Sequence, residues 1–455
     1  MRLVPVIVAA GAAAVVGVWP SGPRAQAADP TRYVSTSGTD NPTCDRSHPC
    51  RTVQHGVDVA TPGDTVRIAA GTYVEQVLVS KTVTLVGAGV DKTIIKGPDV
   101  KTFDQYNRTY IVEVTSAATL GVTALTVAGP SGPGGALDCA QNPLSLDMGV
   151  AAINRSTLTM WSAAVRNIYD IDPQGQETSG CQRGDAISVG KPGGVDVSLA
   201  VPASANLSGV LVSVYQKDGV AVRTAGSQLR MVGNRVENRP SSVIAPNGVE
   251  VLDGAVADIR FNSVTGNQCN LPAICGPDPF NNTEASGILT FAASPQTVIA
   301  GNFVSANDMG VYTDDGIGIH GNQINDNRSV GVYVDTDATK LHVTGNATNR
   351  DGYYGIAIGP MFPVDQGGTG KPNVGGNYFI ENSATGNQKY DLYQSSDAGP
   401  NTNRDNHCDT AYPSKSYWDC EGSESRDDGD SSDPEDHGSP HGDGAAARRP
   451  VGSDS

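Results

Sequence analysis

Two segments of this chain each place a tyrosine just before aspartates, a combination that could bind and process a sugar. Tyr312 precedes Asp314 and Asp315, and Tyr333 precedes Asp335 and Asp337. If the two segments are neighbouring strands, the tyrosines lie about 5 Å apart and form a flat platform for sugar rings. The same pair could instead be a surface aromatic ladder that only stiffens a sheet, and both interpretations stay open.

The carboxylates allow three interpretations. Asp314, Asp315 and Asp335 could supply a general acid and a nucleophile, because retaining glycosidases hold two carboxylates at roughly 5 Å. Asp335 and Asp337 could instead bind Ca²⁺, which takes several carboxylate oxygens. Aspartate is also a favoured turn residue, so the acids could be solvated ends of strands.

For the other candidate side chains, the neighbouring sequence gives less information about their role. His320 could act as a general base near neutral pH, or it could be an ordinary surface histidine. Glu250 occupies the place of Tyr312 in an earlier repeat, so we expect it on the substrate-binding face. Lys217 and Arg260 could offset the carboxylates of a uronate, or act as the base of a lyase.

The strands that must hold these residues belong to a repeat. A glycine followed by alternating apolar residues and then a Gly-Asn-like pair recurs, and the opening glycines are 29, 39, 23, 21 and 24 residues apart. These glycines are Gly219, Gly248, Gly287, Gly310, Gly331 and Gly355. Such a unit is too short for a strand–helix–strand crossover, and a period in the low twenties is typical of a solenoid.

Aligning the repeats predicts which residues share a face. Val311 and Val332 should point inward, and one outward column should contain Ala221, Glu250, Leu289, Tyr312, Tyr333 and Ala357. If alternation continues, Asp314 and Asp335 join the outward face. The glycines are expected to allow corners with positive φ. A scaffold role is expected for Asn234, Asn262, Asn302, Asn322, Asn346 and Asn377, through amide ladders at a corner.

The two ends of the chain differ in composition from the repeats. Residues 1–27 combine a basic start, an apolar run and a small-residue cleavage site, so we expect a secretory signal peptide and an extracellular protein. Residues 28–420 are expected to form the repeat domain, with no membrane span in the mature chain. Residues 421–455 are acidic, almost without apolar residues, and are expected to be a disordered tail.

The cysteines agree with export, because an even number in a secreted chain favours disulfides. The chain has eight: Cys44, Cys50, Cys139, Cys181, Cys269, Cys275, Cys408 and Cys420. Near neighbours could pair as 44 with 50, 269 with 275 and 408 with 420, leaving 139 with 181, although eight cysteines allow 105 connectivities. The net charge of −17 argues against a nucleic-acid partner.

The start of the mature chain resembles the right-handed parallel β-helix proteins of the pectin lyase-like superfamily. The resemblance rests on Thr52-Val53-Gln54, Gly63-Asp64-Thr65-Val66, Ala70-Gly71-Thr72-Tyr73 and Thr84-Leu85-Val86-Gly87. Residues 52–60 could form a short helix, which would cover the open end of the coil. With the later repeats, the resemblance covers roughly residues 32–420 and implies an all-β fold, a single-stranded right-handed parallel β-helix with a short N-terminal capping helix.

The enzyme signatures of that superfamily are absent or fragmentary in this chain. The local motifs of pectin methylesterases and the Asp-Pro-His motif of alginate epimerases do not occur. Of the polygalacturonase set, Asp314-Asp315 and the nearby Ile319-His320-Gly321 are fragments. We therefore expect a secreted, monomeric β-helix protein that engages an extracellular polysaccharide. It could cleave the polysaccharide by hydrolysis or by Ca²⁺-assisted lyase chemistry, or it could be a non-catalytic surface or adhesion scaffold.

Overall fold

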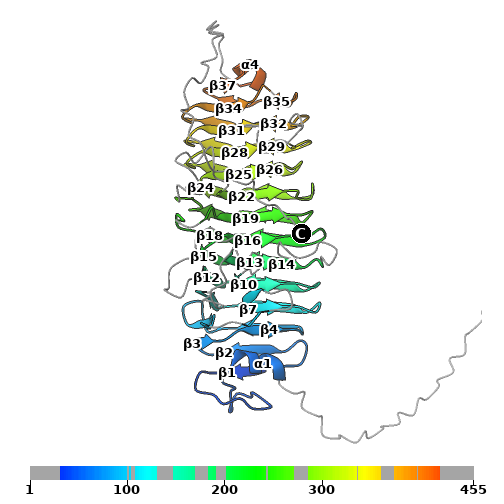
Figure 1. Cartoon of the computed structure of the whole chain (residues 1–455), viewed down its shortest axis with the longest axis vertical. Coiled ribbons are helices and arrows are strands. Elements are labelled where there is room, and N and C mark those ends of the chain that lie inside the picture. Colours follow the sequence, from blue (N-terminus) through cyan, green and yellow to red (C-terminus); the bar gives the residue numbers. More distant parts are fainter. Residues whose placement is uncertain are drawn as a thin grey trace, which may run out of the picture.

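The computed structural model describes residues 31–99, 102–103, 108–130, 147–169, 183–190, 201–241, 244–270, 285–335, 337–359, 374–396 and 398–420. The predicted signal peptide (1–27) and acidic tail (421–455) lie outside these residues. Within them, parallel strands form three long sheets of 13, 12 and 12 strands, which we call sheets A, C and B. The sheets stack into one elongated coil (Figure 1), so the predicted parallel β-helix is confirmed.

Sheet A contains β1 (Thr31–Val34), β2 (Thr65–Ile68), β5 (Val83–Val86), β8 (Thr119–Thr123), β11 (Thr157–Trp161), β14 (Ser204–Ser208), β17 (Gln228–Val232), β20 (Val256–Arg260), β23 (Val298–Ala300), β26 (Gly318–His320), β29 (His342–Thr344), β32 (Tyr378–Ile380) and β35 (Thr402–Arg404). Sheet B contains β3 (Gly71–Val74), β6 (Thr93–Lys96), β9 (Thr126–Ala128), β12 (Ala164–Ile168), β15 (Leu211–Tyr215), β18 (Arg235–Glu237), β21 (Ser263–Thr265), β24 (Phe303–Ser305), β27 (Gln323–Asn325), β30 (Ala347–Asn349), β33 (Ser383–Thr385) and β36 (His407–Cys408).

Sheet C contains β4 (Val77–Val79), β7 (Thr109–Val114), β10 (Asp147–Ala152), β13 (Asp185–Val189), β16 (Asp218–Val222), β19 (Asn247–Leu252), β22 (Ser286–Phe291), β25 (Met309–Thr313), β28 (Val330–Val334), β31 (Tyr354–Ile358), β34 (Tyr390–Gln394) and β37 (Ala411–Tyr412). Each turn of the coil therefore adds one strand to each sheet, and the repeat glycines fall in the strands of sheet C.

Short helices lie at the two ends of the coil. The helix predicted over residues 52–60 is observed as α1 (Val53–Val59), and the Thr52 hydroxyl accepts a hydrogen bond from the His55 N–H at its start. It lies beside β1 and β2 at the blue end of Figure 1. At the other end, α4 (Lys415–Trp418) buries Trp418, whose ring meets Phe379 edge-on at 5.5 Å.

The opening glycines are required by close packing rather than by backbone conformation. A Cβ built on Gly219 would lie 2.5 Å from the carbonyl oxygen of Gly248 on the next rung, and one on Gly310 would lie 2.4 Å from that of Gly331. Neither residue has a positive φ. Positive φ occurs at other glycines, such as Gly233 and Gly321. The expected corner role is therefore wrong for the repeat-opening glycines.

An amide ladder along one corner confirms the scaffold role of the asparagines, with one correction. Each side chain accepts from both the backbone N–H and the side-chain amide of its predecessor, through Asn234, Asn262, Asn302, Asn322, Asn346, Asn382 and Asn406. Asn377 belongs to a different corner, where its N–H donates to Asn401. Asn382 therefore takes the place that was predicted for Asn377.

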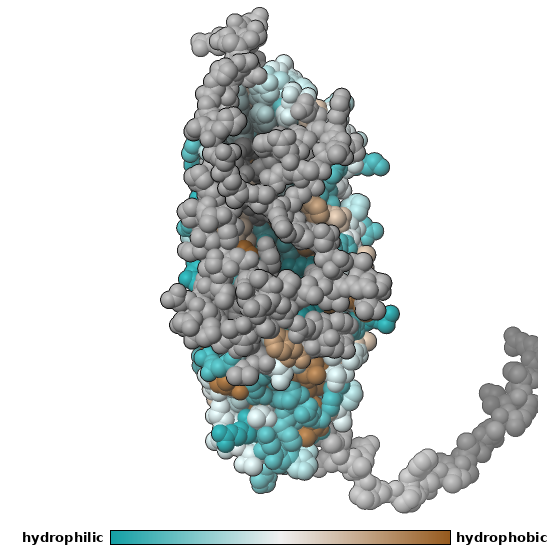
Figure 2. Space-filling model, in the orientation of Figure 1, coloured by the Kyte–Doolittle hydropathy of each residue, from teal (hydrophilic) through white to brown (hydrophobic). Residues whose placement is uncertain are grey.

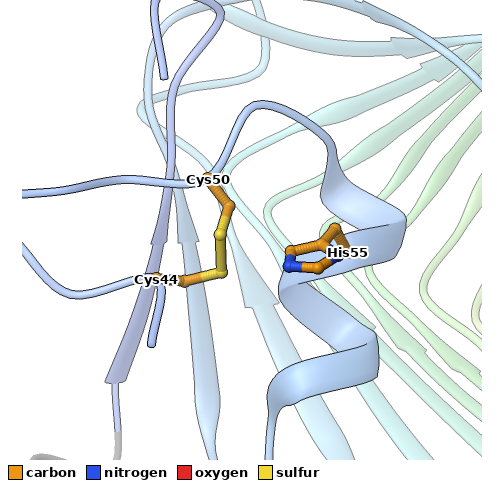
Figure 3. A group of neighbouring side chains, drawn as sticks. All are labelled: Cys44, Cys50 and His55. Atoms are coloured by element: carbon orange, nitrogen blue, oxygen red, sulfur yellow. A yellow bond between two sulfur atoms is a disulfide. The ribbon is translucent and has the colours of Figure 1, made fainter. Parts of the chain in front are cut away.

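Disulfides join two of the predicted cysteine pairs, Cys44–Cys50 and Cys408–Cys420. Cys269 is also disulfide-bonded. Its predicted partner Cys275 and the predicted pair Cys139–Cys181 lie outside the described residues. Sulfur atoms at 44 and 50 lie beside the imidazole of His55 on α1 (Figure 3).

Candidate active site

Strands β25 and β28 place the two tyrosines on neighbouring rungs, as predicted. Glu250 pairs with Leu289, Leu289 with Tyr312, Tyr312 with Tyr333, and Tyr333 with Ala357. Val311 and Val332 are fully buried in the core. The outward column of sheet C is therefore confirmed as a column of paired residues.

The tyrosines do not form an open flat platform. Their ring centroids are 5.5 Å apart, but the ring planes are inclined by 59°, and Tyr333 is 0% exposed. Both hydroxyls donate to the carboxylate of Asp335, from Tyr312 at 2.5 Å and from Tyr333 at 3.1 Å. Tyr312 and Asp335 are half-buried and can still contact a ligand. The platform prediction is thus corrected to a tilted tyrosine pair anchored on an acid.

A second pair of acids follows β25. Asp314 is half-buried and accepts a hydrogen bond from the N–H of Ala292 at 3.2 Å, while the N–H of Asp315 donates to the Thr313 hydroxyl at 3.0 Å. Burial raises the pKa of Asp314 to about 8, and the neighbouring Asp315 and Asp335 carboxylates add to the shift. Burial also raises the pKa of Asp315, against the hydrogen bond from the N–H of Ala293.

Burial therefore favours a protonated carboxyl in this pair. Asp315 Oδ2 is buried and has no hydrogen-bond partner among the described residues. We call Tyr312, Asp314, Asp315, Tyr333 and Asp335 the acid–tyrosine site. It combines a carboxyl whose pKa burial raises to about 8 with a second acid one rung away, and glycoside hydrolysis uses two carboxyl groups of this kind.

His320 does not join this site. It lies on β26 of sheet A, where Ile319 points into the core and His320 points outward from a different face of the coil. Its Nδ1 lies 2.7 Å from the Thr344 hydroxyl, and burial lowers its pKa, helped by His342 and Arg260. Arg260 is on sheet A as well. The predicted grouping of His320 with the aspartates is therefore wrong, because the chain turns a corner between residues 314 and 318.

The predicted Ca²⁺ ligands are not gathered into a cation site. Asp337 is exposed, whereas Asp335 accepts the two tyrosine hydroxyls. Across the described ranges, one group of three potential metal ligands occurs, formed by Cys44, Cys50 and His55. Its sulfurs form a disulfide and cannot act as thiolate ligands (Figure 3). Ca²⁺ binding at Asp335 and Asp337 stays a prediction.

Glu250 lies in a buried ionic cluster that the sequence did not reveal. The guanidinium of Arg223 donates to Asp185 at 2.7 Å, to Asp218 at 2.7 Å and to Glu250 at 2.5 Å. Glu250 is 6% exposed, so the open substrate-binding position predicted for it is wrong. We call Asp185, Asp218, Arg223 and Glu250 the Arg223 cluster. It lies on β13, β16 and β19 and just after β16, on the same sheet as the acid–tyrosine site.

Burial also shifts the pKa values of the acids in this cluster. Burial, together with the charges of Glu250 and Asp185, raises the pKa of Asp218 well above its ordinary value. Burial opposes ionisation of Glu250 as well, but Arg223 and Lys217 outweigh it and lower the pKa of Glu250. Asp185 Oδ1 is buried and accepts no hydrogen bond from any residue that the structure describes. One signal of the cluster is present in the sequence, because Asp218 directly precedes a repeat glycine, as does Asn247, whose side-chain amide donates to Asp218 and Glu250.

The aromatic column also extends further than predicted. Beyond Ala357 it continues to Tyr393 and Tyr412, whose rings stack at 5.5 Å and 19°. Tyr354 and Tyr390 form a parallel row beside them. The ring faces are turned toward one another, so this part of sheet C is an aromatic ladder. The pattern was missed because residues 390–394 lack the repeat glycine.

The N-terminal end of the coil shows a mainly polar surface on the face seen in Figure 2. In the orientation of Figure 2, its N-terminal rungs show mostly hydrophilic residues with a few hydrophobic ones between them. Among the described residues, the exposed hydrophobic side chains of these rungs include Val74 and Leu78. The described residues contain no helix that is long and apolar enough to cross a membrane.

The match to a protein-family model agrees with this architecture. Residues 198–359 match the family model described as the right handed beta helix region. Similar solved structures include the A-module of a mannuronan C-5 epimerase from Azotobacter vinelandii, with 15% identity, a TM-score of 0.41, and coverage of 80% of this chain and 94% of that one. An alginate lyase from Paenibacillus has 15% identity, a TM-score of 0.40, and coverage of 82% and 98%.

A lacto-N-biosidase from Eubacterium ramulus has 14% identity and a TM-score of 0.46, with coverage of 83% of this chain and 67% of that one. No curated protein sequence matches the chain. The strand order of the three sheets and the family-model match together assign the fold. The chain folds as a right-handed parallel β-helix.

Proposed function

We propose that this protein binds an extracellular polysaccharide at the acid–tyrosine site and cleaves it as a glycoside hydrolase. The observation that carries the proposal is the carboxyl of Asp314, whose pKa is raised to about 8 one rung away from Asp335. In this role Asp314 donates its proton to the glycosidic oxygen, and Asp335 stabilises or attacks the sugar carbon from which that oxygen departs.

Hydrolysis fits the described residues better than lyase chemistry does. A lyase needs a base beside the proton α to a uronate carboxylate. His320 and Arg260 lie on sheet A, and Lys217 lies near the Arg223 cluster, where it lowers the pKa of Glu250. Export to an oxidising compartment is supported by the disulfides Cys44–Cys50 and Cys408–Cys420.

A non-catalytic binding scaffold is the second candidate, favoured by one specific contact. Because Asp335 accepts hydrogen bonds from Tyr312 and Tyr333, its oxygens are less available as a nucleophile. A scaffold would use the tyrosine edges and Asp335 only to hold sugar hydroxyls. The two candidates share the same residues and differ in what Asp314 does.

The test is a screen of the purified chain against neutral, amino-sugar and uronate polysaccharides, with new reducing ends and unsaturated products measured together. Hydrolysis predicts new reducing ends without unsaturated products. Asp314→Asn should no longer form these reducing ends, whereas Asp337→Asn should still form them. Retention of one polysaccharide without turnover would support the scaffold. No turnover and no retention across the panel would refute carbohydrate engagement.

A further inference from the structure

Two histidines lie on neighbouring rungs of sheet A, away from the acid–tyrosine site. His320 ends β26 and His342 begins β29, and these two strands pair directly in parallel. In this register His342 pairs with Gly318, which lies two residues before His320 and therefore on the same face of β26. His320 is half-buried and His342 is exposed. This face of the coil plays no part in the proposed function.

The absence of a side chain at residue 318 lets His320 lean toward His342. A Cβ built on Gly318 would lie 2.4 Å from Nε2 of His320, so the imidazole covers the glycine. Gly318 does not have a positive φ, so the backbone itself does not require a glycine there. Because neighbouring strands are about 4.8 Å apart, Nε2 of His320 lies roughly 5 Å from the Cβ of His342.

Neighbouring side chains orient both rings. Nδ1 of His320 lies 2.7 Å from the Thr344 hydroxyl. In the tautomer with a proton on Nδ1, the ring donates to Thr344 and keeps the lone pair of Nε2 on the side of Gly318. The ring of His342 stacks on Tyr378, with centroids 4.6 Å apart and planes inclined by 12°. This contact covers a face of the His342 ring and not the nitrogens at its edge.

The chemistry of this pair suits a metal ion. A histidine that binds a metal through one ring nitrogen usually donates a hydrogen bond from the other, as His320 can to Thr344. Neutral imidazole is the form that binds, and it suits borderline ions such as Zn²⁺, Cu²⁺ and Ni²⁺. Burial lowers the pKa of His320, and the charges of His342 and Arg260 add to the shift. Arg260 itself pairs with Asp258.

We propose that His320 and His342 form a two-histidine site for a divalent transition-metal ion such as Zn²⁺, Cu²⁺ or Ni²⁺. The ion binds Nε2 of His320 and a ring nitrogen of His342, and water completes its coordination. Zn²⁺–nitrogen bonds are about 2.0–2.1 Å long, so the two nitrogens must lie within about 4 Å of each other. Rotation of the exposed His342 side chain supplies this approach. The site does not depend on the proposed function.

The test is calorimetric titration of the full chain with Zn²⁺ and with Cu²⁺. We expect both ions to bind, and Cu²⁺ to bind more tightly than Zn²⁺. His320→Ala and His342→Ala each remove one of the two protein ligands, so each should weaken binding by more than about tenfold. Thr344→Val removes the hydroxyl that orients His320 and should weaken binding by about tenfold.

Gly318→Ala tests the geometry, because it keeps both histidines. Its Cβ would occupy the place of the His320 ring, so binding should weaken as much as in His320→Ala. His407→Ala removes an exposed histidine of sheet B and should leave binding unchanged. The same holds for a joint substitution of His437 and His441, which lie outside the described residues.

Several results would overturn the site. One is the absence of binding by the unmodified chain, and another is binding that survives His320→Ala or His342→Ala. Loss of binding in the joint variant of His437 and His441 would assign the ion to the end of the chain instead. Unchanged binding by a folded Gly318→Ala would contradict the placement of the His320 ring. If Gly318→Ala does not fold by circular dichroism, the two single histidine variants decide the question.

Discussion

Two groups of carboxylates lie two rungs apart on sheet C, and the protein neutralises them differently. In the Arg223 cluster, a buried guanidinium holds three acids in fixed positions at 2.5–2.7 Å. In the acid–tyrosine site, no such cation contacts Asp314 and Asp315 among the contacts described above, and burial raises the pKa of both carboxyls. A guanidinium is a permanent counter-ion, whereas a proton can be transferred. The comparison indicates a scaffold role for the first group and a chemical role for the second.

The largest effect is expected from removing the permanent counter-ion. Arg223→Met leaves three buried carboxylates unpaired, so the free energy of unfolding should fall by about 3–5 kcal/mol. Urea denaturation measures the loss. The control is Arg235→Met, whose pair with Glu237 is at the surface with Arg235 67% exposed, and it should cost less than about 1 kcal/mol. Similar losses in both variants would contradict the difference between buried and exposed pairs.

Removing the transferable proton should lower turnover. On the polysaccharide that the screen identifies, Asp314→Asn should lower the turnover rate by about a hundredfold or more, because the general acid is gone. Retention of the polysaccharide should be unchanged, since Tyr312 and Asp335 remain. Turnover equal to that of the unmodified chain would remove Asp314 from the mechanism.

Asp351 is another buried acid, and it tests whether a protonated carboxyl can take the place of an amide in the scaffold. Asp351 takes the place of an asparagine in a second amide ladder, where Oδ1 accepts from the backbone and side-chain N–H groups of Asn327 at 2.9 Å. Oδ2 is buried without a hydrogen-bond donor among the described residues, and burial raises the pKa of Asp351 well above its ordinary value. Asp351→Asn should therefore stabilise the protein by about 1 kcal/mol at pH 8.

The matched control for that substitution is Asp326→Asn. Asp326 is exposed and pairs with Arg350 at 2.7 Å, so its loss should change stability by less than about 1 kcal/mol. If Asp351→Asn destabilises the protein at pH 8, then Asp351 is ionised in the ladder. That result would contradict the raised pKa of this buried acid.

Asp314 should also make the stability of the protein depend on pH. The folded protein keeps the Asp314 proton up to a pKa of about 8, whereas the unfolded chain loses it near the ordinary pKa of 3.8. Between these values the folded state binds more protons, so this contribution falls as pH rises. The stability of Asp314→Asn relative to the unmodified chain should therefore increase from pH 4 to pH 8. A constant difference across that range would contradict the raised pKa.

The repeat made most of the fold predictable, because one rule places many residues. Once Val311 and Val332 point inward, the pairing of Tyr312 with Tyr333 follows from the period of two. The ladder of Asn234 to Asn346 follows in the same way. The repeat did not predict which corner of the coil an asparagine occupies when two lie close together in the sequence. Asn377 was therefore predicted in the ladder position that Asn382 occupies.

The candidate site was less predictable, because it depends on corners and burial. Only four residues lie between Asp315 and His320, yet the chain turns from sheet C to sheet A between them. Glu250 was placed in the correct column, but its partner Arg223 comes from the preceding rung, and nothing in the repeat shows that contact. Periodicity predicts which residues share a face, whereas charge pairing depends on side chains that reach across rungs.

The proposed role of Asp314 as a general acid requires that it keeps a proton at neutral pH. A ¹³C NMR titration of aspartate carboxyl carbons in the folded protein tests this, with the Asp314 signal assigned by its absence in Asp314→Asn. We expect this carboxyl to titrate near pH 8. A pKa near the ordinary value of 3.8 would contradict it and leave sheet C with acids that only bind.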